Sequence, residues 1–593
     1  MSAKLFGFSP LSVLLPEAIA GVLTVALLYY VIQRRLGWLA GLAAALALAV
    51  FPSFVAVSRD NGVDPLLILL MTLACATALW AADSGRWRAL LCSAVLVGLA
   101  FNTKTLAAYL VVPGIALAFA VCAPGSLVRR LGQLAVAGLV MLAVSFSWIA
   151  LVELTPASQR PFVGGSTNNT ELGLTFEYNG FGRVGGQSGG PGRVPVRPGA
   201  VVHSQPLAPA AGRRPPPGGH PGGGRARHAK HAPAHPRRAV ALINNRQKVI
   251  PFGGPTGPLR LFGKGLGDQG GWILPFALLG AIALGCVLLL APAGAQPPRS
   301  RRRDPRLAAL LVLGGWFVVE ALVLSFSNGI VHPYYVSALG PGTAAMAGAG
   351  VLAFGALAKR AWSDWRRLLA PGAVAATLAA QIVLLHRAGY MHWFIPVLMI
   401  GAGIAVAALL VLRRGTLWAA ALTLCVLLIA PAAYSTTTWR APVEGTFPAA
   451  GPHQATGRGG VGLPRKDVPR ERLLIDYALS HGGGSRWAVL MDAANTAAPL
   501  ILLGYNAGAL AGYSGTDPAL DGRGLARLVA RREARYVVLG GEFSTRGGNR
   551  ATAATIRACR ELPAAQWQGA PTFLHSLVLF DCAGRERQLA AYN

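Results

Sequence analysis

The sequence predicts a polytopic α-helical membrane protein of about 12 transmembrane helices, with a C-terminal extracytoplasmic α/β domain. The 593 residues are 53% hydrophobic and only 13% charged, and the mean hydropathy is +0.48. That is more apolar surface than one soluble core can bury. Long apolar runs recur along the chain, and the composition becomes that of a soluble protein only after residue 436. The bilayer is therefore the expected solvent for most of the chain.

The apolar runs are expected to be helices, because unpaired backbone groups in lipid cost several kcal/mol each. The runs lie at about 11–33, 36–57, 65–83, 88–101, 105–122, 132–152, 271–291, 306–327, 334–357, 368–386, 392–412 and 416–435. They divide the chain into N-terminal membrane helices (1–152), a large loop (153–270), C-terminal membrane helices (271–436) and a soluble domain (437–593).

The basic residues predict the orientation, because Lys and Arg are retained on the cytoplasmic side. Every second connection is basic, namely those at 34–35, 86–88, 129–130, 299–306, 359–367 and 413–414. Twelve spans put all six inside, and the large loop and the C-terminal domain outside, as in a multi-pass plasma-membrane protein. Since the basic residues behind the formal charge of +31 lie mainly in short connections between apolar runs and in one Gly/Pro-rich stretch, we expect contacts with membrane lipids and no nucleic-acid binding.

The segment 183–250 is expected to be disordered. It contains twelve Lys or Arg residues, no acid and five of the eleven histidines, in a Gly/Pro-rich background without apolar periodicity. Such a composition buries too little apolar surface to order a chain. A genuine insertion and a frame-shifted stretch of the gene both explain it.

The C-terminal domain alternates helix-like and strand-like segments. Helices are expected at 470–480 and 520–532, and strands at 486–491 and 535–540, which indicates a small α/β domain. Cys559 and Cys582 lie in this domain and would form a disulfide in an oxidising compartment. A free pair of thiols is the alternative.

Polar residues that could carry chemistry gather in the connections assigned to the outer face. These are Arg59, Asp60 and Asp64 in one connection, Lys104 in the next, and His332, Tyr334 and Tyr335 in a third. Carboxylates beside cations at a membrane surface suit a lipid-phosphate substrate, because cations bind the phosphate and a carboxylate, or a metal ion that it binds, activates the reacting hydroxyl. The alternative is that these short loops are polar only because they touch water.

Six stretches of the sequence carry a family resemblance: Phe51–Arg59 with Val63–Asp64, Phe101–Lys104, Arg160–Asn169, Tyr178–Gly182, Leu259–Phe262 and Asn328–Tyr335. They resemble the bacterial branch of the dolichyl-phosphate-mannose protein mannosyltransferase and aminoarabinose transferase superfamily, the GT-C glycosyltransferases. The similarity covers nearly the whole chain except 186–250, and the C-terminal part is similar to the outer domain of actinobacterial members.

The resemblance implies transfer of a sugar from a polyprenyl-phosphate donor to a hydroxyl of a protein, cell-wall glycan or lipid. Asp64 matches the second acidic position of the family, and we assign Asp64 and Asp60 to catalysis. Arg59, Lys104, His332 and Tyr334 are assigned to the donor phosphate. A divalent metal is a possible cofactor, as in some family members, but no residue is assigned as its ligand.

The beginning of the chain departs from the family pattern. Family members begin with a further span and an outer loop that carries an acidic catalytic base, whereas Met1–Ser9 resembles the sequence just after that loop. We therefore expect an N-terminally truncated chain, with loss of activity as one consequence. A transporter or flippase, or a non-catalytic membrane protein, remains the alternative to a transferase.

Overall fold

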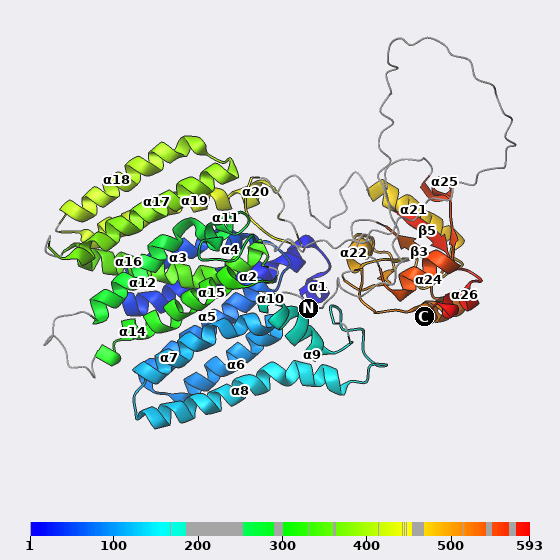
Figure 1. Cartoon of the computed structure of the whole chain (residues 1–593), viewed down its shortest axis with the longest axis horizontal. Helices are drawn as coiled ribbons and strands as arrows, with labels where there is room; N and C mark the ends of the chain where they lie inside the picture. Colours follow the sequence, from blue (N-terminus) through cyan, green and yellow to red (C-terminus); the bar gives the residue numbers. More distant parts are fainter. Residues whose placement is uncertain are drawn as a thin grey trace, which may run out of the picture. The chain divides into compact units, whose positions relative to one another are not determined.

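The computed structural model describes residues 2–166, 168–185, 253–289, 301–329, 331–359, 363–412, 414–441, 443, 445, 447–452, 468–513, 515–540, 548–568 and 577–592. The chain divides into two compact units (Figure 1). The membrane unit contains Met1–Pro161, Thr170–Ser188 and Lys248–Val461, and the soluble unit contains Phe162–Asn169, Gly189–Gln247 and Gly462–Asn593. Most of the segment expected to be disordered lies outside the described residues. Its first residues, however, belong to helix α10 (Gly182–Gly185), so its predicted start at 183 is wrong.

The membrane unit consists of helices. Its first half contains α1 (Ser2–Phe6), α2 (Pro10–Leu36), α3 (Trp38–Ala49), α4 (Pro52–Val57), α5 (Asp64–Ser84), α6 (Trp87–Lys104), η1 (Thr105–Val111), α7 (Val112–Cys122), α8 (Leu127–Leu154), α9 (Glu171–Gly173), η2 (Leu174–Phe181) and α10. Its second half contains η3 (Arg260–Phe262), α11 (Gly267–Gly270), η4 (Gly271–Ile273), α12 (Leu274–Leu289), α14 (Pro305–Ala309), η5 (Leu310–Gly314), α15 (Gly315–Phe326), η6 (Pro333–Leu339), α16 (Gly340–Ala358), η7 (Trp365–Leu368), α17 (Leu369–Ala388), η8 (His392–Phe394), α18 (Ile395–Val411), α19 (Thr416–Ser435) and α20 (Thr437–Arg440).

The chain is a multi-pass membrane protein, but the count of long helices differs from the predicted twelve. Among the described residues, ten helical stretches are long and apolar enough to cross a membrane. The run at 36–57 is not one of them, because it is divided into the 12-residue α3 and the short α4. The runs at 88–101 and 105–122 are joined into one stretch, Trp87–Cys122.

That joined stretch turns back on itself. Thr105 has a φ of 43° at the end of α6, which interrupts the regular helix. Pro124, which follows α7, fills the space beside Gly85, which precedes α6. Since the two ends of the stretch meet, α6 and the η1–α7 segment run in opposite directions, and Lys104 lies at the turn between them.

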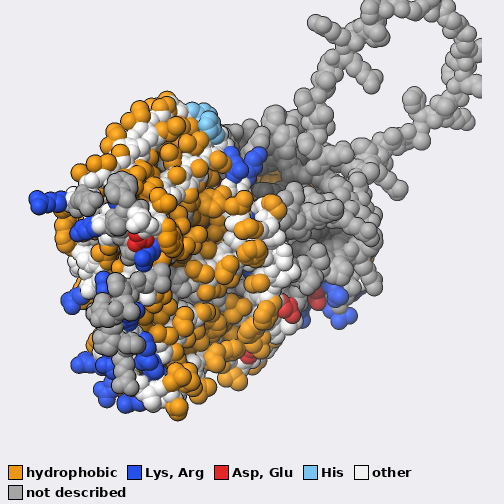
Figure 2. Space-filling model, turned by 60° about the vertical axis from the view of Figure 1, so that its left-hand side comes forward, with side chains coloured by type: hydrophobic (Ala, Val, Ile, Leu, Met, Phe, Trp, Pro, Cys, Tyr) orange, Lys and Arg blue, Asp and Glu red, His pale blue; other side chains and the backbone are white. Residues whose placement is uncertain are grey.

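The basic connections gather at the end of the helices opposite this turn. Arg35 pairs with Asp83 at 2.5 Å, and Arg130 and Arg302 both lie near Cys122 at the end of α7. Figure 2 shows most of the visible Lys and Arg side chains at one end of a broad hydrophobic surface. This separation of a basic end from an apolar belt is the pattern expected of membrane helices.

The helix α16 lies at the centre of the bundle, and the membrane stretch that contains it is 89% buried. Small residues allow its close packing. If Gly280 of α12 carried a Cβ, that atom would lie only 2.8 Å from the Cα of Gly350 in α16, which is too close for two carbon atoms. A Cβ at Gly342 would likewise lie 2.9 Å from the Cα of Phe317 in α15. Such glycine contacts let membrane helices approach closely. They hold α16 against α12 and α15.

The soluble unit is an α/β domain, as predicted. Its elements are α21 (Val468–His481), β1 (Val489–Met491), α22 (Ala494–Leu502), β2 (Ala507–Ala509), α23 (Gly522–Ala530), β3 (Tyr536–Leu539), α24 (Arg550–Ala558), β4 (Arg560–Glu561), α25 (Ala564–Gln568), β5 (Val578–Asp581) and α26 (Glu586–Ala591). The strand order is β2-β1-β3-β5-β4. Strands β2, β1 and β3 are parallel, and β5 is antiparallel to both β3 and β4.

Both faces of this sheet are covered, and the alternation along β3 shows how. Tyr536 and Val538 belong to the hydrophobic cluster formed with α21, α22 and α25. Val537 and Leu539 belong to the cluster formed with α23, α24 and α26. Because successive side chains of a strand point to opposite faces, the four apolar residues of β3 fill two cores, and the domain has three layers.

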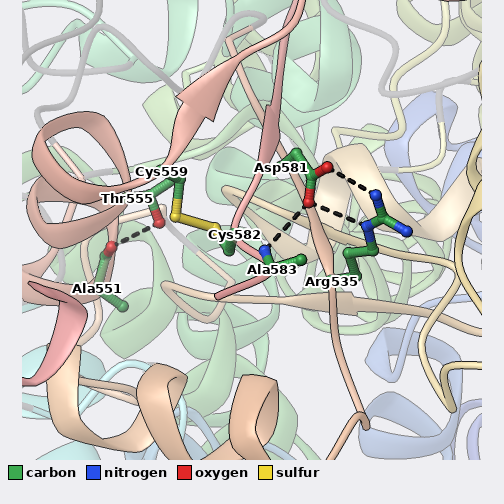
Figure 3. The surroundings of a disulfide bond; sticks show 7 residues. All are labelled: Arg535, Ala551, Thr555, Cys559, Asp581, Cys582 and Ala583. Atoms are coloured by element: carbon green, nitrogen blue, oxygen red, sulfur yellow. Dashed lines mark hydrogen bonds and ion pairs between the residues drawn. A yellow bond between two sulfur atoms is a disulfide. The ribbon is translucent and has the colours of Figure 1, made fainter. Parts of the chain in front are cut away.

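A disulfide and an ion pair stabilise one edge of the domain (Figure 3). Cys559 and Cys582, with a sequence separation of 23, have their sulfur atoms 2.01 Å apart, so the pairing considered from the sequence is present as a disulfide. Beside it, Asp581 accepts hydrogen bonds from Arg535 Nε at 3.0 Å and Nη2 at 2.8 Å. The end of β5 is thus tied to α24 by a covalent bond and to the start of β3 by a bidentate ion pair.

Candidate functional site

An ion pair between Asp64 and Lys104 is at the centre of the candidate site. Asp64 is the first residue of α5, and Lys104 is the last residue of α6. Lys104 Nζ lies 2.6 Å from Asp64 Oδ1, with the carboxylate side chain 7% exposed and the lysine side chain 24% exposed. The lysine therefore keeps one accessible side while the carboxylate is nearly enclosed.

Two tyrosine rings flank this ion pair. Lys104 Nζ lies 4.8 Å from the centre of the Tyr334 ring and 4.6 Å from that of Tyr335. Both tyrosines belong to η6, which precedes the central helix α16. Cations bind favourably to such aromatic faces. The connections that end α6 and begin η6, far apart in the sequence, therefore meet at Lys104.

His332 adjoins the same rings as an uncharged side chain. Its ring is nearly parallel to that of Tyr334, with centroids 5.5 Å apart. Burial, together with the positive charges of Arg183 and Lys104, lowers the pKa of His332 to about 3. At neutral pH the imidazole can stack and form hydrogen bonds, but it does not add a positive charge to the site.

Arg183 is a member of the site that sequence reasoning missed. Its guanidinium lies 5.8 Å from the centre of the Tyr335 ring. The backbone around it is fixed, because Gly329 N donates to Arg183 O at 3.1 Å and Asn328 N donates to Val184 O at 2.8 Å. Arg183 directly follows the family-like stretch Tyr178–Gly182, but it was assigned to the segment expected to be disordered. The adjacent motif was the available signal.

Asp60 and Arg59 lie on the connection before α5 but in different surroundings. Asp60 is buried, with 7% of its surface exposed. Gly445 lies beside it, since a Cβ added to this glycine would be 3.7 Å from Asp60 Oδ1. Arg59 is exposed, and its guanidinium forms no hydrogen bond or ion pair within the described part of the chain. The structure thus brings Asp64, Lys104, His332 and Tyr334 together and leaves Arg59 facing outward.

Two further carboxylates approach the ion pair from neighbouring helices. Glu17 of α2 lies close to Asp64, and Glu320 of α15 lies close to both Asp64 and Lys104. One oxygen of each glutamate is buried without a hydrogen-bond partner among the described residues. An acid in an apolar run is a sequence signal of function, and for Glu320 that signal was overlooked. Within the described ranges no group of three His, Cys, Asp or Glu residues is placed to hold a metal ion.

Comparison with protein families gives one match in the N-terminal part of the chain and one in the C-terminal part. A family model described as dolichyl-phosphate-mannose-protein mannosyltransferase matches residues 1–149. A second model, described as putative mannosyltransferase YkcB-like, C-terminal, matches residues 474–558. The two matches fall on the first half of the membrane unit and on the soluble domain.

Two curated proteins of Bacillus subtilis (strain 168) are similar over nearly the whole chain. "Putative mannosyltransferase YkcB" is 31% identical over 588 residues, which cover 93% of this chain and 80% of the relative. "Putative mannosyltransferase YycA" is 30% identical over 570 residues, which cover 91% and 81%. Among solved structures, ArnT from Cupriavidus metallidurans bound to undecaprenyl phosphate aligns with a TM-score of 0.47, 16% identity and coverage of 99% and 86%. The apo state of ArnT aligns with the same TM-score and 15% identity, with coverage of 100% and 86%.

Proposed function

Because the chain belongs to the same family as YkcB and YycA, a family of the dolichyl-phosphate-mannose-protein mannosyltransferase type, we propose that the Asp64–Lys104 site transfers a sugar from a polyprenyl-phosphate donor to an acceptor hydroxyl. The chain is a membrane glycosyltransferase, and the transporter alternative is not favoured by these relatives. The acceptor is a protein, a cell-wall glycan or a lipid.

The partly accessible Lys104 beside the buried carboxylate of Asp64 is the observation that supports this proposal most strongly. Asp64 holds Lys104 in place at 2.6 Å, and the accessible side of the ammonium group can receive an anion. Arg183, near Tyr335, adds a second cation to the same neighbourhood. Two cations beside an aromatic wall at the end of membrane helices suit the phosphate of a lipid carrier, because charge-assisted hydrogen bonds are the strong ones.

The carboxylates are suited to accept the proton that the acceptor hydroxyl loses during sugar transfer. As the acceptor oxygen bonds to the anomeric carbon of the sugar, the bond from that carbon to the phosphate oxygen breaks, and polyprenyl phosphate leaves. The hydroxyl proton passes to a carboxylate, for which Asp64 and Asp60 are the candidates. Lys104 and Arg183 stabilise the negative charge on the departing phosphate, and Tyr334 and the neutral His332 orient it.

A transfer assay with matched aspartate variants tests the proposed function. In membranes supplied with radiolabelled polyprenyl-phosphate mannose, we expect Asp64→Asn to reduce transfer by about a hundredfold, because both a charged carboxylate and the anchor of Lys104 are lost. Asp83 lies in the last turn of the same helix and pairs with Arg35 at 2.5 Å. As a partly exposed pair contributes little, Asp83→Asn should retain activity. Undiminished transfer by Asp64→Asn would contradict the assignment, and Asp60→Asn tests the second carboxylate in the same assay.

We further propose that the site, the large loop and the soluble domain face the exterior of the plasma membrane. Two observations support this exterior location. The basic connections gather at the opposite end of the helices, and positively charged loops are retained in the cytoplasm. Disulfides persist in oxidising compartments, and Cys559 is bonded to Cys582. Thiol trapping in intact cells checks the proposal, since free thiols at both positions would argue against it.

A further inference from the structure

Arg260 is a buried cation at the end of the large loop, and the proposed chemistry does not use it. It begins η3 and is 4% exposed. Its side chain donates to three backbone carbonyl groups: Nε to Gly253 O at 3.2 Å, and Nη1 to Leu324 O at 3.1 Å and to Ser327 O at 2.6 Å. Gly253 belongs to the large loop, whereas the other two acceptors lie at the end of α15. Arg260 therefore joins the end of the loop to the end of α15.

The two backbone amides just after α15 donate to the other described end of the loop, in α10. Asn328 N donates to Val184 O at 2.8 Å, and Gly329 N donates to Arg183 O at 3.1 Å. In a continued α-helix each amide would donate to the carbonyl group four residues earlier. The hydrogen bonds to α10 thus replace the helical pattern where α15 ends.

The carbonyl groups that these amides leave accept hydrogen bonds from the segment around Arg260. Leu324 O accepts from Arg260 itself, and Ser325 O accepts from Gly257 N at 2.9 Å. A cation is favoured here, because the last carbonyl groups of a helix carry partial negative charge. The loop clasp, as we call this set of contacts, joins residues 324–329 to Arg183, Val184, Gly257 and Arg260.

The loop clasp fixes the path of the chain from α15 to the site. Residues 327–332 connect α15 to η6, and this connection ends at His332. Its described residues form no helix or strand of their own, so their position depends on the contacts of the clasp. Through Gly329 the same contacts hold the backbone of Arg183, whose guanidinium lies 5.8 Å from the centre of the Tyr335 ring. Groups assigned to the phosphate thus depend on Arg260.

Arg260 is not itself placed to bind the phosphate. Its side chain is nearly enclosed, and both Nε and Nη1 donate to carbonyl groups. An anion that drew the guanidinium away would leave buried carbonyl groups without partners, which is costly. Any effect of Arg260 on the donor must therefore pass through the residues that it holds.

We propose that Arg260 is a positioning residue for the donor phosphate, which through the loop clasp holds Arg183 and His332 at the Lys104 site. The inference rests on the proposed function and deepens it. It also gives a role to the family-like stretch Leu259–Phe262, to which the resemblance assigned none.

Binding of polyprenyl phosphate to an Arg260 variant tests this role. Arg260→Lys keeps the charge but loses the planar fork that reaches several carbonyl groups at once. We expect the affinity of the folded full-length protein for polyprenyl phosphate to fall about tenfold, as for loss of one charged contact. The KM for the sugar-bearing carrier should rise by a similar factor.

Arg130 provides the matched control. It is also 4% exposed, and its side chain donates to the backbone carbonyl groups of Ser126, Ala120 and Val121. This arginine lies at the basic end of the helices, away from the site. Arg130→Lys should therefore affect the stability of the fold in a similar way and leave the affinity for polyprenyl phosphate unchanged.

Two glycine variants test the loop clasp from its other side. A Cβ at Gly329 would overlap the backbone carbonyl group of Arg183, so Gly329→Ala should separate the two segments and weaken carrier binding as Arg260→Lys does. A Cβ at Gly372 of α17 would have no heavy atom of the described residues within 4 Å, and Gly372→Ala should leave binding unchanged. This pair decides the question if Arg260→Lys does not fold.

A double variant distinguishes positioning from a general loss of stability. If Arg260 acts through Arg183, Arg260→Lys combined with Arg183→Gln should lose less affinity than the product of the two single losses, because both changes remove the same phosphate contact. A loss equal to that product would overturn the positioning role.

The positioning role and the proposed function fail in different ways. Wild-type affinity in folded Arg260→Lys, or equal weakening in Arg130→Lys, would overturn the positioning role and leave the transferase intact. Wild-type protein that binds no polyprenyl phosphate would contradict the proposed function itself, and the positioning role with it.

Discussion

Each unit of the molecule contains a nearly buried aspartate paired with a basic side chain, and the two pairs are similar in geometry. Asp64 in the membrane unit lies 2.6 Å from Lys104, and Asp581 in the soluble unit lies 2.8 Å from Arg535. The carboxylate side chains are 7% and 6% exposed, and the cations are 24% and 33% exposed. Distance and burial alone therefore do not distinguish them.

The surroundings of the two pairs differ. Arg535 binds both oxygens of its aspartate, and the backbone N–H of Ala583 adds a third hydrogen bond. Burial by itself would raise the pKa of Asp581, but these hydrogen bonds outweigh it and hold that pKa below its usual value. Lys104 binds only one oxygen of Asp64 and lies near two tyrosine rings and the carboxylate of Glu320. An ion pair whose hydrogen-bonding groups all have partners stabilises a fold. An ion pair whose ammonium group keeps an accessible side can also bind a ligand.

The largest effect is expected from replacing the cation of each pair, Lys104 or Arg535, because only the first replacement should reduce sugar transfer. We expect Lys104→Met to reduce transfer by about a thousandfold, because the phosphate loses its principal cation and Asp64 is left unpaired. Arg535→Met should leave the activity of the folded protein unchanged and destabilise the soluble unit by about 2 kcal/mol. Transfer assays combined with urea-dependent pulse proteolysis of the full chain measure both. Loss of transfer by folded Arg535→Met protein would show that the soluble pair also serves catalysis.

Removal of the disulfide should have the next largest effect, on stability alone. Cys559 and Cys582 are separated by 23 residues. Closing a loop of this size stabilises a fold by about 3 kcal/mol in the chain-entropy treatment. The double change Cys559→Ser with Cys582→Ser should therefore lower the urea midpoint of the soluble unit without changing transfer by the folded fraction. Replacement of Cys92 and Cys425, exposed cysteines of the membrane unit, is the matched control and should leave that midpoint unchanged.

A third aspartate, Asp492, sharpens the comparison, because no Lys or Arg among the described residues forms an ion pair with it. Asp492 follows β1 and is 3% exposed. Burial raises its pKa to about 6, against the hydrogen bonds from Thr496 and the backbone. Since the folded value exceeds the unfolded value of about 3.9, its contribution to stability is full below about pH 4 and is lost as the pH rises through 6.

Asp492→Asn should therefore stabilise the soluble unit at pH 7, by about 2 kcal/mol. It should also flatten the fall in stability between pH 4 and 6. Asp581→Asn should have the opposite sign, because the pKa of Asp581 is lowered and its contribution is lost only as the pH falls. Urea midpoints measured across this pH range distinguish the two variants. A stabilising effect at pH 4 that equals the effect at pH 7 would contradict the assigned cause for Asp492.

The connections of the site show how far sequence reasoning reached. Asp64, Lys104, His332 and Tyr334 were all selected from polar loops between apolar runs, and the structure brings these four together. Phe447, whose ring stacks on that of His332 with centroids 4.5 Å apart, carried no comparable signal, since an aromatic residue in a Gly/Pro-containing linker is ordinary. Its position depends on the pairing of Gln269 with Ala450, residues 181 positions apart. Arg183 had a signal, but the low-complexity sequence after it obscured where the ordered chain ends.

The sequence by itself determined the membrane character of the chain, the alternation of basic connections and the α/β character of the C-terminal domain. These properties follow from composition and short-range periodicity, because transfer into lipid and the pleat of a strand act on neighbouring residues. Only the tertiary structure decided that Asp64, Lys104 and the tyrosines of η6 meet at one place, and which face of each loop meets the site. Such contacts depend on packing between helices distant in the sequence, where a single glycine such as Gly85 or Gly329 sets how closely two segments can approach.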